Sequence, residues 1–195
     1  MTTSSQSCKG FTLIELLVTL SLITILMTIA APSFTSFLRN AELTSRTNSF
    51  LANITAARSE AMKRGRDAVV IPLDGASWNS GSVVFVDMNN NRTYEVATDV
   101  LVYRSGDVLP NYLEITANGP ASASPPYMRF DAQGYPKPAS PDTRNFTFSI
   151  ARNDVSGNEV FNQTRRLKVA ITGRARICKP ASASDSACSS SNTYD

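Results

Sequence analysis

Glu15 is the residue of this sequence whose position most needs a chemical explanation. It is the one charged residue between Phe11 and Leu38, a stretch long enough to cross a bilayer, for which about 20 residues suffice. A carboxylate is costly in lipid, so an ionisable residue at membrane depth is a functional candidate. If the chain were cut after Gly10, the new amino group would lie about one helical turn from Glu15. The two groups could neutralise each other between neighbouring copies, which predicts a subunit held in a membrane until it joins a filament.

A second candidate site lies near the C-terminus, where six basic residues and no acid fall within 15 positions: Arg165, Arg166, Lys168, Arg174, Arg176 and Lys179. Thr172 and Gly173 can turn the chain between two strands, so that Arg174 and Arg176 project from one face. Two guanidinium groups at that spacing suit successive phosphates of a nucleic acid. Without neighbouring aromatic residues, such binding would be directed to the backbone and sensitive to salt. A solvated basic face, or contact with an acidic subunit, explains the same residues without DNA.

The cysteines indicate an oxidising compartment. Cys8 precedes the apolar stretch, which leaves Cys178 and Cys188 as a pair close together in sequence. Such a pair suggests a disulfide, with two free thiols as the alternative. The bridge would close a loop of 11 residues and stabilise the fold by about 3 kcal/mol on loop-entropy grounds.

Composition excludes several kinds of chemistry. The 195 residues suit one domain of modest size, and a net charge of +3 is too mild to identify a partner. The chain has no histidine, the commonest general base and metal ligand. It also lacks a Gly-rich phosphate loop and a G-x-S-x-G nucleophile motif. The run Asp87-x-Asn89-x-Asn91 lacks the glycine and the acid of a calcium loop, since Arg92 and Thr98 stand there. We therefore expect no enzyme activity, no cofactor and no metal.

Lys9, Gly10, Phe11 and Glu15 together resemble the type IV prepilin signal, which is shared by type IV pilins and the pseudopilins of type II secretion. The resemblance implies cleavage between Gly10 and Phe11 by a prepilin peptidase, N-methylation of Phe11, and a role for Glu15 in assembly. An ordinary secretory signal fits poorly, because Pro32 would directly follow the candidate cut. A plain signal anchor would leave Glu15 unexplained.

Helical spacing of apolar residues continues after the apolar stretch, and predicts one helix from Phe11 to Arg64. Pro32 should bend this helix, and Gly65 should end it. We expect four segments: a leader at 1–10, a transmembrane and polymerisation half of the helix at 11–38, an amphipathic half at 39–65, and a β-rich domain at 66–195.

In the remainder of the sequence, apolar and polar residues alternate within short segments that are separated by Gly, Pro, Asn and Asp turns. This pattern indicates antiparallel sheets. The expected strands are Ala68–Ile71, Ser82–Val86, Thr93–Val96, Val100–Tyr103, Leu113–Thr116, Tyr127–Phe130, Phe146–Ile150 and Arg166–Ile171. Residues 120–126 and 136–141 are expected loops. The fold class is therefore α+β.

A longer resemblance runs through this region. The motif Trp78-x-x-Gly81-x-x-Val84-Phe85-x-Asp87-x-Asn89-x-Asn91, followed by Arg129-Phe130-Asp131-x-x-Gly134, is similar to the GspH/FimT family of minor pilins and pseudopilins. The resemblance implies a long helix capped by a globular domain of two antiparallel sheets. It also implies an inner-membrane protein with a single span and a periplasmic C-terminal domain, which is incorporated into a pilus or pseudopilus.

The same resemblance bears on function. It implies a minor pilin that helps prime a type IV pilus, or lies near its tip, and contacts other pilins through its helix. Gly173-Arg174-x-Arg176 resembles the GRxR motif with which some FimT-type pilins bind DNA in natural transformation. Gly173, Arg174, Arg176, Lys179, Arg166 and Lys168 are then the candidate contacts to double-stranded DNA. The alternatives are an H-type pseudopilin of type II secretion and a purely structural pilin that binds no DNA.

Overall fold

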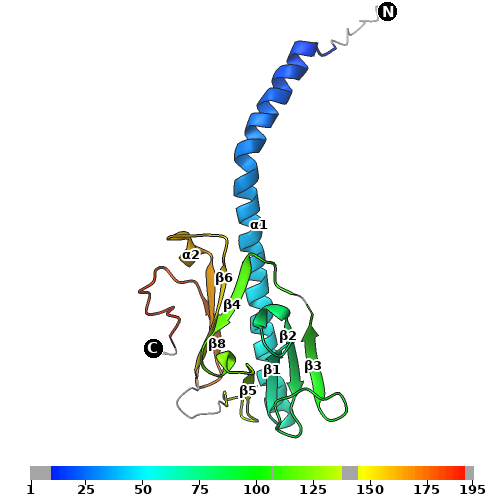
Figure 1. The fold of residues 1–195 in the computed structure, drawn as a ribbon, viewed down its shortest axis with the longest axis vertical. Coiled ribbons are helices and arrows are strands. Elements are labelled where there is room, and N and C mark those ends of the chain that lie inside the picture. Colours follow the sequence, from blue (N-terminus) through cyan, green and yellow to red (C-terminus); the bar gives the residue numbers. More distant parts are fainter. Residues whose placement is uncertain (1–9, 107, 138–144, 192–195) are drawn as a thin grey trace, which may run out of the picture. The chain divides into compact units, whose positions relative to one another are not determined.

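The fold comprises one long helix and two antiparallel sheets, as expected (Figure 1). The structure is a computed structural model that describes residues 10–106, 108–137 and 145–191. The chain divides into two compact units, Met1–Ala41 and Glu42–Asp195. Helix α1 (Leu13–Arg64) begins in the first unit and ends in the second. Part of the loop expected at 136–141 lies outside the described residues.

In the first unit, α1 exposes apolar side chains around its whole circumference. Leu13, Ile14 and Ile29 are 78%, 66% and 72% exposed. In the described part of the chain, α1 is the one helix long and apolar enough to cross a membrane, with a window of mean hydropathy 2.3. The helix continues through position 32, so the proline there does not end it. A bend at this position stays a prediction.

In the second unit, α1 presents a buried stripe to the domain. Leu43, Phe50, Ile54, Ala57 and Ala61 are buried and follow one another at intervals of three, four or seven residues, which keeps them on one helix face. The helix ends at Arg64, as predicted. Gly65 takes a left-handed φ of +63°, and the Arg66 N–H donates to the Ala61 carbonyl at 3.3 Å. This bond is the mark of a Schellman cap, which a residue with a side chain would strain.

Within the described residues, eight strands form two antiparallel sheets. The first sheet has the order β3-β2-β1-β5, with β1 at Ala68–Pro72, β2 at Ser82–Val86, β3 at Val100–Ser105 and β5 at Met128–Phe130. The second has the order β4-β6-β7-β8, with β4 at Leu113–Ala117, β6 at Phe146–Arg152, β7 at Thr164–Val169 and β8 at Ala175–Cys178. The described part of the chain also contains three short helical turns: η1 (Trp78–Ser80), η2 (Gly119–Ser122) and α2 (Glu159–Asn162).

The core lies between α1 and the two sheets. Phe50 of α1, Trp78 of η1 and Phe148 of β6 pack edge to face, with ring centroids 4.8 to 5.6 Å apart. Trp78 also donates its indole N–H to the Ala121 carbonyl at 2.7 Å, which satisfies the polar end of a buried ring. The helix and both sheets therefore share one core.

The strand expected at Thr93–Val96 is wrong, because this segment is an irregular loop. Acidic side chains replace the strand partners that its backbone would need. Asp87 accepts hydrogen bonds from the Asn91 and Arg92 amides, and Asp99 accepts from the Met88 and Glu95 amides. Alternating hydrophobicity alone could not show that these local acceptors compete with a sheet.

Candidate functional site

The first candidate site is the start of α1. The Glu15 amide donates to Thr12 Oγ1 at 3.3 Å, and Glu15 Oε2 accepts from the Thr12 amide at 3.5 Å. This reciprocal pair is a capping box, in which the first residue outside the helix and the third residue inside it satisfy each other's amides. The signal Thr-x-x-Glu is visible in the sequence, but an explanation of Glu15 by charge alone overlooks the role of Thr12.

The capping box gives Glu15 a local role within a single chain. The side chains of Phe11 and Glu15 are exposed, and Gly10 precedes the helix. A carboxylate at this end also suits the positive end of the helix dipole. Charge and capping are therefore two separate properties of the same side chain, and a test of Glu15 must distinguish them.

The second candidate site is the outer face of the second sheet. Arg166 and Lys168 are two residues apart on β7, so they point to the same face. Their partners on β8 are Cys178 and Arg176, so three of the candidate cations share this face. Leu167 between them is fully buried on the opposite face. Strand pairing therefore brings these three basic residues together.

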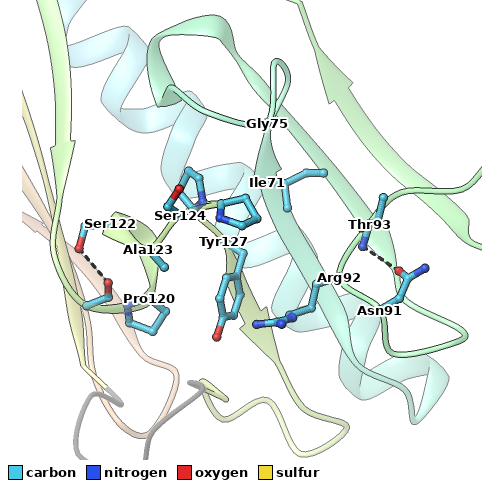
Figure 2. A pocket seen from close by; sticks show the side chains of 13 residues that line it. Ile71, Gly75, Asn91, Arg92, Thr93, Pro120, Ser122, Ala123, Ser124 and Tyr127 are labelled. Carbon is cyan, nitrogen blue, oxygen red and sulfur yellow. Dashed lines mark hydrogen bonds between the residues drawn. The ribbon is translucent and has the colours of Figure 1, made fainter.

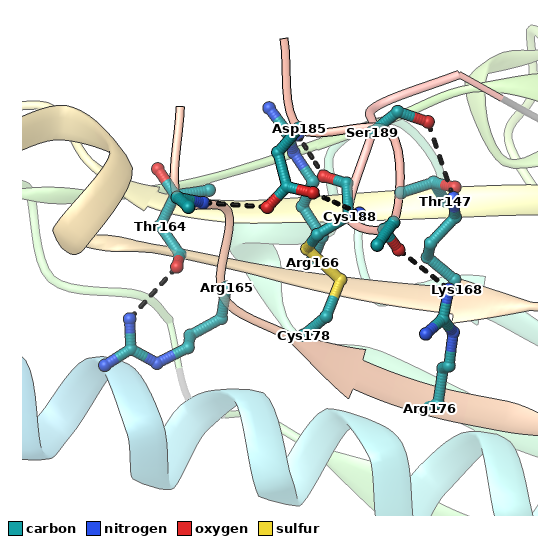
Figure 3. The surroundings of a disulfide bond; sticks show 12 residues. Thr147, Thr164, Arg165, Arg166, Lys168, Arg176, Cys178, Asp185, Cys188 and Ser189 are labelled. Atoms are coloured by element: carbon teal, nitrogen blue, oxygen red, sulfur yellow. Dashed lines mark hydrogen bonds between the residues drawn. A yellow bond between two sulfur atoms is a disulfide. The ribbon is translucent and has the colours of Figure 1, made fainter. Parts of the chain in front are cut away.

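The C-terminal tail lies over this basic face (Figure 3). Arg166 donates to the Cys188 carbonyl, Arg176 donates to the Ala187 carbonyl at 2.8 Å, and Lys168 contacts Ser189 Oγ at 3.5 Å. Burial lowers the pKa of Arg166, an effect that the charge of Asp185 opposes. The tail thus supplies oxygen atoms to three cations that the sequence pattern had assigned to phosphate.

Cys178 and Cys188 hold the tail in place. They form a disulfide, with Cα atoms 5.8 Å apart, which confirms the paired interpretation. Asp185 stabilises the loop between the two cysteines, because its carboxylate accepts hydrogen bonds from the Ala181 amide at 2.9 Å and the Cys188 amide at 3.1 Å. These two hydrogen bonds lower the pKa of Asp185, as expected when backbone amides stabilise the ionised form.

The six candidate DNA contacts are therefore not equivalent. Lys168 is 1% exposed and cannot reach a phosphate while the tail is in place. Arg166 and Arg176 are half-buried and bound to tail carbonyls. Arg174 and Lys179 are exposed. That Arg174 and Arg176 project from one face stays a prediction, but a distant segment of the chain covers Arg176 and leaves Arg174 exposed.

Gly173, the remaining candidate, has a packing role. It is buried in the turn between β7 and β8, with φ at +77°, and a Cβ there would lie 2.0 Å from the Gly134 carbonyl oxygen. Arg58 of α1 bridges the same two loops, because it donates to the Gly134 carbonyl at 3.0 Å and to the Thr172 carbonyl at 3.1 Å. The glycine is needed for the close approach of two loops, whether or not DNA binds.

A long N-terminal helix that is apolar in its first half and packed on two antiparallel sheets in its second defines a pilin-like protein. Residues 46–173 match the family model of the type II transport protein GspH. Residues 5–31 match the prokaryotic N-terminal methylation motif. The chain belongs to the GspH family. It is a minor pilin or pseudopilin of a type IV pilus or a type II secretion system.

Two solved structures resemble this chain at low sequence identity. The type IV minor pilin FimU of Pseudomonas aeruginosa aligns with a TM-score of 0.53 and 18% identity, over 75% of this chain and 99% of that chain. The minor pseudopilin EpsH from the type II secretion system of Vibrio cholerae aligns with a TM-score of 0.49 and 16% identity, over 72% and 96%. A comparison with curated protein sequences gave no match.

Proposed function

We propose that this protein is a minor pilin of a type IV pilus, in which the apolar half of α1 packs against the helices of other pilins. The observation that carries the proposal is a single carboxylate, Glu15, at the start of a helix whose large apolar side chains up to Leu38 are exposed. The proposal includes cleavage between Gly10 and Phe11 by a prepilin peptidase and N-methylation of Phe11. The basic C-terminal region with its disulfide favours the pilus system over the H-type pseudopilin of type II secretion.

Two substitutions separate the charge of Glu15 from its capping role. Glu15→Gln keeps a side chain that can complete the capping box, whereas Glu15→Ala removes both capping and charge. If charge pairing with the Phe11 amine drives assembly, both variants should insert in the membrane at wild-type levels but lose incorporation into pili. The measurement is the amount of subunit in sheared pili relative to the membrane fraction.

Each result has a separate meaning. Normal incorporation of Glu15→Gln with loss for Glu15→Ala would assign Glu15 to capping alone. Normal incorporation of both variants would contradict the assembly role.

A deletion strain distinguishes a type IV pilus subunit from a type II secretion subunit. Loss of the gene should reduce surface pili and leave secretion of a type II substrate unchanged. The opposite pattern would assign the protein to type II secretion.

We also propose DNA binding as a second function, supported by two exposed cations: Arg174 in the turn between β7 and β8, and Lys179 directly after β8. Two cations give a weak contact with phosphates, so binding should be seen at low salt and be indifferent to sequence. A pilin without DNA binding is the alternative. Arg166, Lys168 and Arg176 contribute less while the tail covers them.

Gel retardation of duplex DNA tests this second function. A fragment of residues 39–195 is suitable, because the buried apolar residues of the described chain all lie at or after Leu43. Replacing Arg174 and Lys179 with alanine should weaken the shift and reduce the slope of log affinity against log salt by about two. Arg104→Ala is the matched control, since this exposed arginine lies on β3 of the other sheet. An unchanged shift in the double variant would remove the GRxR turn from consideration.

A further inference from the structure

A cavity of about 610 Å³ lies beside β1 of the first sheet, and its lining shares no residue with either candidate site. Figure 2 shows its arrangement, with the loop from Pro120 to Ser124 on one side, Asn91 to Thr93 on the other, and Tyr127 between them. Its volume falls in the range of about 300 to 1,000 Å³ typical of ligand sites. The assembly and DNA-binding proposals leave this cavity unexplained.

The walls of the cavity are mainly apolar. Pro120, Pro125 and Pro126 come from the loop, and Ile71 comes from β1. Tyr127 is 6% exposed and belongs to a buried cluster with Val69, Val83 and Phe85, so its ring is held by the core. A wall of prolines and one fixed aromatic ring changes little in conformation on binding, which lowers the entropic cost of holding an apolar group.

Arg92 supplies a cation that is held in place at the edge of this apolar surface. Its φ is +64°, a conformation that is uncommon for residues other than glycine. The Arg92 amide donates to Asp87 Oδ2 at 3.0 Å, which holds the strained backbone, and its guanidinium carbon lies 4.8 Å from the centroid of the Tyr127 ring. Strain held in this way is often associated with ligand contacts. Stacking on the ring leaves the N–H groups at the guanidinium edge available for a carboxylate.

Charge indicates the chemistry of the occupant. None of the 13 residues that line the cavity is acidic, and no ion pair of Arg92 occurs within the described part of the chain. A nucleic acid would need several cations for its phosphates, whereas this cavity offers one. One arginine beside apolar walls instead complements a single carboxylate flanked by apolar side chains.

We infer that this cavity binds a short segment of a partner protein in which an acidic residue lies between apolar residues. The carboxylate pairs with Arg92 and the apolar side chains pack on Tyr127 and the prolines. This docking site is independent of the proposed roles of Glu15 and of the GRxR turn, because it shares no residue with either. Its failure and theirs are therefore distinguishable.

Calorimetric titration of the full chain in nonionic detergent micelles tests the inference. The probe is the tripeptide acetyl-Leu-Asp-Phe-amide, and its control is acetyl-Leu-Asn-Phe-amide, which has the same shape without the charge. We expect the aspartate peptide to bind at least ten times more tightly than the asparagine peptide. Arg92→Gly should abolish this preference, because it removes the guanidinium while relieving the backbone strain. Arg104→Ala, which removes an exposed arginine outside the cavity, should leave the preference unchanged.

Three outcomes would overturn the inference. Equal affinity for both peptides would mean that Arg92 does not select a carboxylate, and an undiminished preference in Arg92→Gly would place binding elsewhere. Tighter binding of a single-stranded oligonucleotide than of the aspartate peptide, with the same dependence on Arg92, would assign the cavity to nucleic acid. The assay uses purified protein and does not depend on pilus assembly.

Discussion

At the scale of single residues, the structure changes the interpretation of the GRxR motif. Gly173 is required by a loop contact, and Arg176 binds a carbonyl of the tail. Only Arg174 of the motif is exposed. Packing alone can therefore account for residues of the GRxR pattern. The match to a DNA-binding motif supports DNA binding less strongly once the position of each side chain is known. Glu15 gains a second role for a comparable reason, since its capping partner Thr12 lies three residues before it.

The packing role of Gly173 predicts a large cost for Gly173→Ala. The added methyl group meets the Gly134 carbonyl at 2.0 Å and the backbone has a φ of +77°, so we expect a loss of at least about 3 kcal/mol in the free energy of unfolding. Urea unfolding of residues 39–195 measures it. Gly157→Ala is the matched control, because Gly157 has φ +65° and open space around it, which limits the cost to about 1 kcal/mol. Equal costs would show that the loop contact contributes nothing.

At the scale of elements, the tail and the second sheet stabilise each other. The tail has no strand of its own in the described residues, but several side chains of the sheet bind its carbonyls. Thr147 of β6 donates to the Ser191 carbonyl, and Asn118, next to β4, donates to the Ser190 carbonyl at 2.6 Å. We expect such a segment to depend on its disulfide, because side chains hold it to the sheet and no strand pairing does so in the described residues.

Replacing Cys178 and Cys188 with serine should therefore release the tail. The loss of the closed loop predicts a decrease of about 3 kcal/mol in the free energy of unfolding. Hydrogen exchange should also become faster at the Cys188 position, whose amide donates to Asp185. Reduction of the wild-type fragment by a thiol should give the same two changes. If exchange near position 188 stayed slow in both samples, the hydrogen bonds alone would hold the tail.

At the scale of the whole molecule, the surfaces of the two units suit different surroundings. The first unit has exposed apolar side chains suited to lipid or to other helices, whereas the second unit buries its apolar residues in a core of its own. Helix α1 is the one described element common to both. The division follows from amino-acid composition, because residues 11–38 carry a single charge while the second half of the helix is amphipathic.

This division predicts that residues 39–195 fold without the membrane segment. The fragment should be a soluble monomer in analytical ultracentrifugation and unfold in a single cooperative transition, because its core does not require residues before Leu43. The full chain should require detergent for the same behaviour. A fragment that is unfolded or aggregated would contradict the independence of the second unit.

The sequence alone determined the long helix, its end at Gly65, most of the strands, the disulfide pair and the family. These features depend on short-range signals, such as periodicity, turn residues and a signal of a few positions, which act between near neighbours. The tertiary structure decided what covers each face. Alternation along β7 indicates that Arg166 and Lys168 lie together, but their contacts with Cys188 and Ser189 join residues 22 and 21 positions apart. The cavity beside Arg92 likewise forms between loops that are distant in sequence, because a packed core brings them together.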